Sequence, residues 1–303
     1  MYDCAIIGGG PAALTAAIYL SRFERKTVLL YETLGGQTAI SGTIENYPGF
    51  KTIGGYELIT KIKEQVDDFG VEQRPGYKVD KISKSKAGYR VSMSKNSIEA
   101  KTVLVATGRR HRTLGFENED KLIGKGISYC ATCDGAFSRD KDVIVIGGGY
   151  AATEAALILE KIAKSVTIIC LENSLTGEKT TISKVEKNPR IKIIYDSRVI
   201  EFLLENGMFS GLRIMNVNTN KEGEINASMA FVEIGQVPNS DSFDKIKKNE
   251  AGEIIIDENN MTSISGVFAA GDVTSVKAKQ TIVACGEAAK AAVSINGFIE
   301  KQT

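Results

Sequence analysis

Residues Asp3–Ala13 read DCAIIGGGPAA and decide the fold that we expect. A short apolar run of the buried-strand type leads directly into the pattern G-x-G-x-x-A, and a helical segment follows over residues 14–22. Glycines let a backbone approach a pyrophosphate closely, and the N-terminus of a helix favours the phosphate charge. The stretch therefore predicts a strand–loop–helix unit that binds a dinucleotide.

The residues that follow support this interpretation. A second apolar strand is expected over residues 27–31, and it ends at Glu32, where a carboxylate can accept a hydrogen bond from a ribose hydroxyl. The glycine pattern alone is weak evidence, but strand, loop, helix and acid in this order predict dinucleotide binding. The alternative is a tight strand–helix turn with a solvated Glu32.

The same pattern recurs in the middle of the chain. Residues Asp142–Ala152 read DVIVIGGGYAA, and the alanines that follow the first loop, Ala16 and Ala17, match Ala155 and Ala156. Two similar nucleotide-binding units in one chain indicate an internal repeat, and they usually mean two dinucleotides, such as a flavin and a nicotinamide. The expected fold class is α/β, with two Rossmann-like dinucleotide-binding domains of three-layer ββα type.

Residues Cys130–Gly135 read CATCDG and lie between the two glycine loops. Two thiols separated by two residues can form a disulfide, and one thiol of such a pair usually has a lowered pKa, so that a thiolate exists near neutral pH. Asp134 places a proton donor beside the second sulfur. A zinc site needs about four ligands, but the sequence has no second CxxC and one histidine, His111, in an expected surface loop. A redox dithiol is favoured over zinc and over two inert thiols.

Composition narrows the function classes further. The 303 residues carry 38 Lys and Arg against 37 Asp and Glu, so no basic footprint for nucleic acid exists. No apolar run approaches a membrane span, and the start of the chain predicts no signal peptide. Cys4, Cys170 and Cys285 are expected to be buried structural thiols. These features favour a protein of the reducing cytoplasm without nucleic-acid or membrane partners.

With these motifs in place, the chain resembles the low-molecular-weight thioredoxin reductases nearly from end to end. The resemblance rests on the two glycine loops, the CATCD string, and the short motifs at 35–37, 46–49, 106–108 and 269–272. It implies an FAD-binding domain formed by residues 1–113 and 239–303. Inserted within it, residues 114–238 would form a pyridine-nucleotide-type domain that carries the dithiol. It also implies a homodimer and a rotation of one domain against the other during turnover.

The resemblance assigns roles to individual residues. Cys133 would face the flavin, Cys130 would attack the disulfide of thioredoxin, and Asp134 would be the general acid–base group. The residues that would hold FAD are Gly8, Gly10, Pro11, Ala12, Ala13, Glu32, Gly36, Gln37, Asn46, Thr107, Gly108, Gly271, Asp272, Gln280 and Thr281.

One departure from the family concerns the electron donor. Members that use NADPH carry a His-Arg-Arg-x-x-x-Arg string after the strand that corresponds to 166–170, and its arginines bind the 2′-phosphate. Here residues 170–176 read CLENSLT, where Glu172 would repel that phosphate, and Tyr150 puts a bulky ring in the second loop. The chain looks more like the branch that takes electrons from ferredoxin. NADH, through a bond from its ribose to Glu172, and NADPH remain alternatives.

Two other functions remain open at this stage. A flavin oxidase that closes small-molecule dithiols with oxygen would use a similar CxxC, although such enzymes resemble this chain less at Asp134. A zinc-stapled nucleotide-binding or sensor module is the non-enzyme alternative. Oxygen uptake with a small dithiol distinguishes the first, and a flavin spectrum with metal analysis distinguishes the second.

Overall fold

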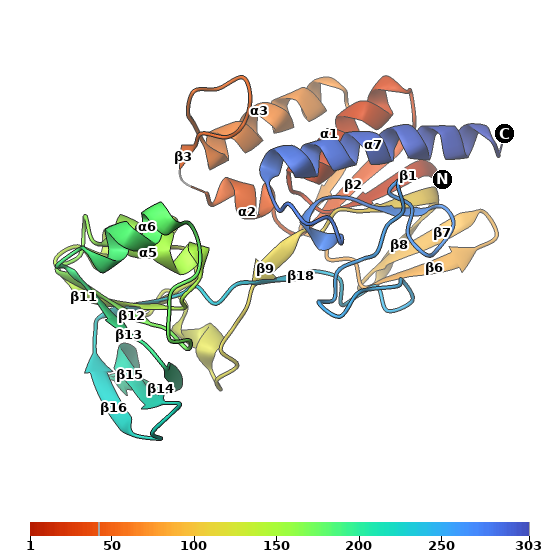
Figure 1. Ribbon diagram of the computed structural model, residues 1–303. Coiled ribbons are helices and arrows are strands. Elements are labelled where there is room, and N and C mark those ends of the chain that lie inside the picture. The colour runs from red at the N-terminus through yellow and green to blue at the C-terminus, as the bar shows by residue number, and fades with distance from the viewer. Residues whose placement is uncertain (42, 303) are drawn as a thin grey trace. The chain divides into compact units, whose positions relative to one another are not determined.

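The computed structural model describes residues 1–41 and 43–302 and divides the chain into two compact units (Figure 1). The first unit combines Met1–Arg110 with Val237–Thr303, and the second is His111–Gln236. The chain passes between them in β9 (Arg109–His111) and β18 (Gln236–Pro238), which pair with each other. The boundaries implied by the family resemblance, 113/114 and 238/239, lie a few residues further along the chain.

The first unit is built on a seven-stranded sheet in the order β5-β2-β1-β8-β7-β6, with β19 paired to β8. Strands β1, β2, β5, β8 and β19 are parallel, and β6 and β7 extend the sheet in antiparallel fashion. The strands are β1 (Tyr2–Ile7), β2 (Thr27–Tyr31), β5 (Glu72–Pro75), β6 (Lys81–Ser85), β7 (Gly88–Met93), β8 (Asn96–Val105) and β19 (Val267–Ala269). A separate pair joins β3 (Thr43–Ile44) to β4 (Ile53–Gly54).

Helices cover one face of this sheet (Figure 1). They are α1 (Pro11–Arg22), α3 (Gly55–Asp68) and α7 (Thr281–Glu300), with the short α2 (Gly36–Ala39) nearby. Alanines of α1 and α7 share one buried cluster with Ile6 and Leu29 of the sheet, so the two helices pack closely. Residues that alternate with these, such as Ala5 and Val28, face a second cluster on the opposite side of the sheet.

One helix, α7, is long and apolar enough to cross a membrane by length and composition alone. The expectation that nothing in the sequence approaches a membrane span is corrected to that extent. The buried side of α7, including Ala288 and Ile295, belongs to the core cluster of the first unit. A core helix that packs through small apolar residues passes the same test, and α7 has that role here.

The second unit has a five-stranded parallel sheet in the order β10-β17-β11-β12-β13. Its strands are β10 (Ile127–Ser128), β11 (Asp142–Ile146), β12 (Ser165–Ile169), β13 (Ile191–Ile194) and β17 (Met229–Val232). Val143 and Val145 face a cluster with α5 (Tyr150–Leu159) and α6 (Lys179–Glu186), whereas Ile144 and Ile146 face the antiparallel layer. That layer consists of β14 (Ser197–Glu205), β15 (Met208–Asn216) and β16 (Glu222–Asn226). The predicted fold class, two Rossmann-like domains of ββα type with one inserted in the other, is confirmed.

Candidate redox active site

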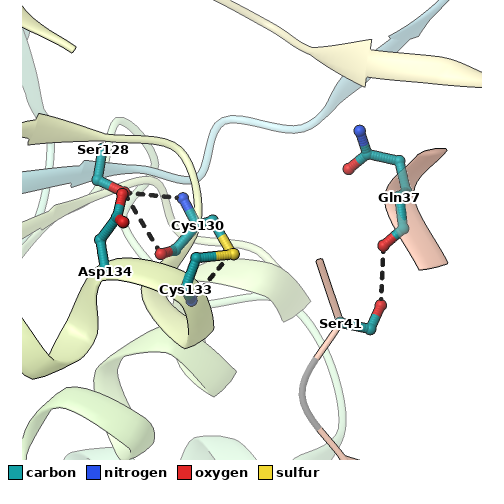
Figure 2. Close-up of a disulfide and its surroundings, with 6 residues drawn as sticks. All are labelled: Gln37, Ser41, Ser128, Cys130, Cys133 and Asp134. Atoms are coloured by element: carbon teal, nitrogen blue, oxygen red, sulfur yellow. Dashed lines mark hydrogen bonds between the residues drawn. A yellow bond between two sulfur atoms is a disulfide. The ribbon is translucent and has the colours of Figure 1, made fainter. Parts of the chain in front are cut away.

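The two cysteines lie at the start of a short helix, α4 (Ala131–Asp134), directly after β10 (Figure 2). Cys130 and Cys133 form a disulfide with a Cα–Cα distance of 5.3 Å. Cys130 is the N-cap residue, and its Sγ accepts a hydrogen bond of 3.1 Å from the Cys133 N–H. A donor aimed at Cys130 Sγ would stabilise a thiolate on that sulfur after reduction.

Asp134 is connected to the dithiol through a side chain that the sequence analysis missed. The hydroxyl of Ser128 donates to Asp134 Oδ2 over 2.6 Å and accepts the Cys130 N–H over 3.0 Å (Figure 2). Ser128 is buried at the end of β10. A serine two residues before the first cysteine gave no signal of this role, because the contact with Asp134 depends on the turn into α4.

A second carboxyl near the dithiol was also missed. Glu233 directly follows β17, the strand beside β10, and its side chain accepts a hydrogen bond from the Ala131 N–H, within the CATC turn. Burial raises the pKa of Glu233 to about 7, and the Ala131 N–H opposes that effect. The sequence does carry a signal here, since an acid placed directly after a buried parallel strand lies at the edge where sites are built.

The first glycine loop is shaped for close approach. A Cβ on Gly8, whose φ is +131°, would lie 2.2 Å from the Ala106 carbonyl oxygen, and one on Gly9 would lie 2.3 Å from the Thr33 carbonyl oxygen. Gly10 is the N-cap of α1, has no side-chain cap, and has open space where its Cβ would be. The first N–H groups of α1 are therefore left for a ligand, and an anion fits there.

The sheet brings the other predicted residues of the first unit to the same edge. Strands β1, β2, β8 and β19 run parallel, so the residues that follow them share one edge: Gly8 and Gly10, Glu32, Thr107 and Gly108, and Gly271 and Asp272. Pro11, Ala12 and Ala13 are buried in the first turn of α1. A Cβ on Gly36 would lie 3.6 Å from Gly10 Cα, which places α2 beside the loop.

The start of α7 meets the same region. Asn46 Nδ2 donates to Gln280 Oε1 over 2.9 Å, and the hydroxyls of Thr38 and Thr281 lie 3.0 Å apart. The Gln37 carbonyl accepts a hydrogen bond of 3.0 Å from Ser41 within the chain turn (Figure 2). These contacts bring Asn46, Gln280 and Thr281 together.

Asp272 adds a charged group to this edge. Burial raises the pKa of its carboxyl, while Lys279 and Arg109 act to lower it. A half-buried acceptor, an open helix N-terminus and two glycines that tolerate no side chain fit a dinucleotide such as FAD. Glu32 is exposed at the end of β2, where a ribose would meet it.

The second glycine loop has different surroundings. A Cβ on Gly148 would lie 2.2 Å from Cys170 Sγ, and the Gly148 carbonyl accepts a 2.8 Å hydrogen bond from the Thr176 N–H. Segment 170–177 therefore lies against the loop. Glu172 belongs to this segment and is exposed, with its Oε2 3.7 Å from Cys170 Sγ, and the ring of Tyr150 is 55% exposed at the start of α5.

The three other cysteines and the histidine can also be compared with what the sequence predicted. Cys4, Cys170 and Cys285 are free and buried, as predicted. His111, expected in a surface loop, instead lies half-buried on β9, with its ring centroid 5.9 Å from that of Tyr129. The reason is tertiary packing against the Tyr129 ring, which local sequence does not encode. Burial lowers the pKa of His111.

Comparison with known proteins identifies relatives over the whole chain. The family described as pyridine nucleotide-disulphide oxidoreductase matches residues 2–288. A thioredoxin reductase from Peptoclostridium acidaminophilum is 37% identical over 99% of this chain and 98% of its own length. An alkyl hydroperoxide reductase component from Staphylococcus aureus is 35% identical over 98% of this chain, but this chain spans 59% of that protein.

Solved structures give the same result. The structure of Lactococcus lactis thioredoxin reductase in the FR conformation has a TM-score of 0.91 at 35% identity, covering 99% of this chain and 100% of that one. A ferredoxin-flavin thioredoxin reductase from Clostridium acetobutylicum is more distant, with a TM-score of 0.55 at 26% identity over 99% of this chain and 98% of that one.

Proposed function

The chain belongs to the pyridine nucleotide-disulphide oxidoreductase family, and we propose that it reduces the disulfide of thioredoxin through Cys130 and Cys133. It is a flavoprotein oxidoreductase, and FAD is its cofactor. The observation that carries the proposal is the Cys130–Cys133 disulfide at the start of α4, with Asp134 held beside it by Ser128. The relatives named thioredoxin reductase support thioredoxin as the substrate.

Each side chain of the dithiol site has a chemical task. FAD, when bound, supplies the two electrons that open the disulfide. The Cys130 thiolate then attacks one sulfur of thioredoxin, which breaks the thioredoxin disulfide and leaves a mixed disulfide. Cys133 attacks Cys130 Sγ, releases the second thioredoxin thiol and restores the disulfide. Asp134 gives a proton to the departing thiolate and takes one from Cys133. The Cys133 N–H that bonds to Cys130 Sγ supports Cys130 as the attacking thiol.

The first unit is proposed as the FAD-binding domain and the second as the domain that carries the dithiol. The open N-terminus of α1 would receive the pyrophosphate, Glu32 the adenosine ribose, and Asp272 a hydroxyl of the cofactor. Thr107, Gly108, Gln280 and Thr281 would line the same edge. A cytoplasmic homodimer completes the proposal, and light scattering of the purified protein tests the dimer.

Reduced ferredoxin is the proposed electron donor. Recognition of a 2′-phosphate normally uses guanidinium groups, and segment 170–176 contains none. Instead it places the exposed Glu172 close to the second glycine loop, where the Gly148 carbonyl is already bonded to Thr176. The Clostridium acetobutylicum relative, a ferredoxin-flavin enzyme, supports a donor of this kind. NADH with Glu172 on its ribose is the second candidate, because that carboxylate is exposed and can accept a hydroxyl.

The test separates the reductase activity from the donor. Holoenzyme reduced photochemically under anaerobic conditions is mixed with oxidised thioredoxin, and new thioredoxin thiols are counted. We expect two thiols per reduced dithiol in the wild type and none in Cys130→Ser. Absence of thiols with the wild type would refute the reductase proposal whatever the natural donor is.

A further inference from the structure

Glu233 lies beside the dithiol because of strand register. In the parallel pair β10–β17, Ile127 lies opposite Ala230 and Ser128 opposite Phe231. Cys130 and Glu233 lie two residues beyond Ser128 and Phe231, just past the ends of the two strands. Both therefore lie at the same edge of the sheet. The backbone of Glu233 is anchored there: its N–H donates to the Ile146 carbonyl over 2.8 Å.

Gly147 makes this position tight. A Cβ on Gly147 would lie 2.3 Å from the Glu233 carbonyl oxygen, so the backbone at the end of β17 sits directly against the second glycine loop. The direction of the Glu233 side chain is therefore set by backbone that has little room to move. Its carboxyl accepts the N–H of Ala131, a buried residue of the turn that separates the two cysteines.

The N–H groups of this turn are shared among three acceptors. Ala131 N–H binds the Glu233 carboxyl, Cys133 N–H binds Cys130 Sγ, and Asp134 N–H binds the Cys130 carbonyl. Of these acceptors, Glu233 alone comes from outside the turn. A change in the charge or position of the Glu233 carboxyl therefore acts directly on the backbone that positions the two sulfurs.

We infer that Glu233 is a positioning residue of the Cys130–Cys133 pair, and that its charge controls the thiolate that forms when the disulfide is reduced. The inference rests on the proposed role of this pair as the redox dithiol, and it deepens that role. The family resemblance had pointed to Asp134 for proton transfer. Glu233 is a second carboxyl, on a different element, that acts through the backbone of α4.

The charge balance of reduction explains why a second carboxyl matters. Reduction of the disulfide adds two electrons, and near neutral pH the site also takes up protons. One proton completes a thiol, and a second is taken up by the Glu233 carboxylate, which leaves the other sulfur as a thiolate. The step then adds two electrons and two protons to the site. A thiolate and a carboxylate close together disfavour each other, so the two groups titrate as a coupled pair.

Burial prepares Glu233 for this exchange, since it raises the pKa of the carboxyl to about 7. The other titratable or charged groups on the elements packed against β17 and α4 are Tyr129, Asp134, Asp142, Tyr150, Glu154 and Arg213. Three have partners of their own: Tyr129 donates to Glu119, Asp142 pairs with Lys164, and Arg213 pairs with Glu201 and Glu224. Asp134 is the one that shares α4, and it is bound to Ser128.

The test compares Glu233→Gln with the wild type. Glutamine keeps an oxygen to accept the Ala131 N–H but cannot titrate. The holoenzyme is reduced with dithiothreitol, freed of excess reductant, and alkylated with iodoacetamide over a pH series. Peptide mass spectrometry then gives the alkylation rate of each thiol. Glu222→Gln, an exposed carboxyl on β16, removes the same charge far from the dithiol and serves as the control.

We expect two ionisations in the wild type and in Glu222→Gln, one of them near pH 7. Glu233→Gln should lose that ionisation. It should alkylate about tenfold faster just above that pH, where the ionised wild-type carboxylate raises the thiol pKa by about one unit. Superimposable pH profiles of Glu233→Gln and wild type would overturn the inference. Because the measurement uses no thioredoxin, a failure of thioredoxin reduction and a failure of this inference are separate results.

A second measurement tests the inference without the Glu233→Gln variant, in case that variant does not fold. In wild-type protein and in Asp134→Asn, the infrared difference between oxidised and reduced forms at pH 7 should show a carboxylate becoming protonated. A difference spectrum without that change in either protein would overturn the inference.

Discussion

Ser128 Oγ lies 2.6 Å from Asp134 Oδ2 and 3.0 Å from the backbone nitrogen of Cys130, so one buried hydroxyl connects the acid to the dithiol turn. The Asp134 carboxyl is therefore oriented by a side chain that lies outside its own helix. A proton on Asp134 can be delivered only if this orientation persists during exchange.

The first prediction concerns this pair. Asp134→Asn keeps the shape and removes the titrating group, so thioredoxin reduction should fall by about 10²–10⁴-fold. Ser128→Ala keeps the Asp134 carboxyl but removes the hydrogen bond that orients it, so a smaller loss of thioredoxin reduction is expected. FAD content should be unchanged in both, and stopped-flow reduction of thioredoxin measures the effect. Equal loss in both variants would show that orientation, rather than proton transfer, limits the rate.

The second prediction assigns the two sulfurs. In Cys133→Ser, the Cys130 thiolate should form a mixed disulfide with thioredoxin that no second thiol resolves, and a covalent complex should appear on non-reducing gels. In Cys130→Ser no such complex should form. Cys285→Ser, a buried free thiol on α7, is the control and should turn over normally. A complex trapped through Cys133 would reverse the assignment.

Particular residues show how far the sequence alone could predict this site. Gly8, Gly10 and Glu32 follow strands of a parallel sheet, and a local pattern suffices because parallel strands end at one edge. Ser128 gave no such signal, and the position of Glu233 after a buried parallel strand indicated the edge of the sheet but not its contact with Ala131. Glu233 reaches Ala131 only through the register of β17 against β10, strands that are far apart in the sequence.

The donor and His111 show two other limits. His111 has polar neighbours in sequence, yet the Tyr129 ring packs against it and half-buries it. Segment 170–176 contains no arginine, which argues against one cofactor but does not identify its replacement. The missing arginines narrow the choice of electron donor. Identifying the donor requires a measurement of flavin reduction with each candidate.

The third prediction separates fold from cofactor binding at the first glycine loop. Gly8→Ala would place a Cβ 2.2 Å from the Ala106 carbonyl oxygen at a φ of +131°, so we expect a loss of stability of about 1–3 kcal/mol or more. Gly10→Ala meets open space at a φ of −82°. It should fold normally but retain less FAD, because its methyl group points to where the pyrophosphate would lie. Chemical denaturation and the flavin absorbance after purification measure both effects.

Two results would count against this view of the loop. Full FAD content in Gly10→Ala would mean that the cofactor does not approach α1 closely. Wild-type stability in Gly8→Ala would mean that the loop can relax away from Ala106.

The fourth prediction is a pH dependence of stability. The pKa of Glu233 is raised from 4.5 to about 7 in the folded protein. A carboxyl with a raised pKa contributes its stability below the unfolded value and loses it as pH rises through the folded value. Between about pH 4.5 and 7, the wild type should therefore lose about 1–3 kcal/mol of unfolding free energy that Glu233→Gln does not lose. Urea denaturation of the two proteins at several pH values measures the difference, and parallel curves would contradict it.

The last prediction tests the donor by building what segment 170–176 lacks. Anaerobic stopped-flow should show slow reduction of the wild-type flavin by micromolar NADPH and fast reduction by reduced ferredoxin. Glu172→Arg removes a repelling charge and supplies a guanidinium that can bind a phosphate in bidentate fashion, so NADPH reduction should accelerate by about tenfold or more. Glu178→Arg makes the same charge change at the N-cap of α6, outside the segment, and should have little effect. Fast reduction of the wild-type flavin by NADPH would refute the ferredoxin proposal. Fast reduction by NADH alone would favour a hydrogen bond from the NADH ribose to Glu172.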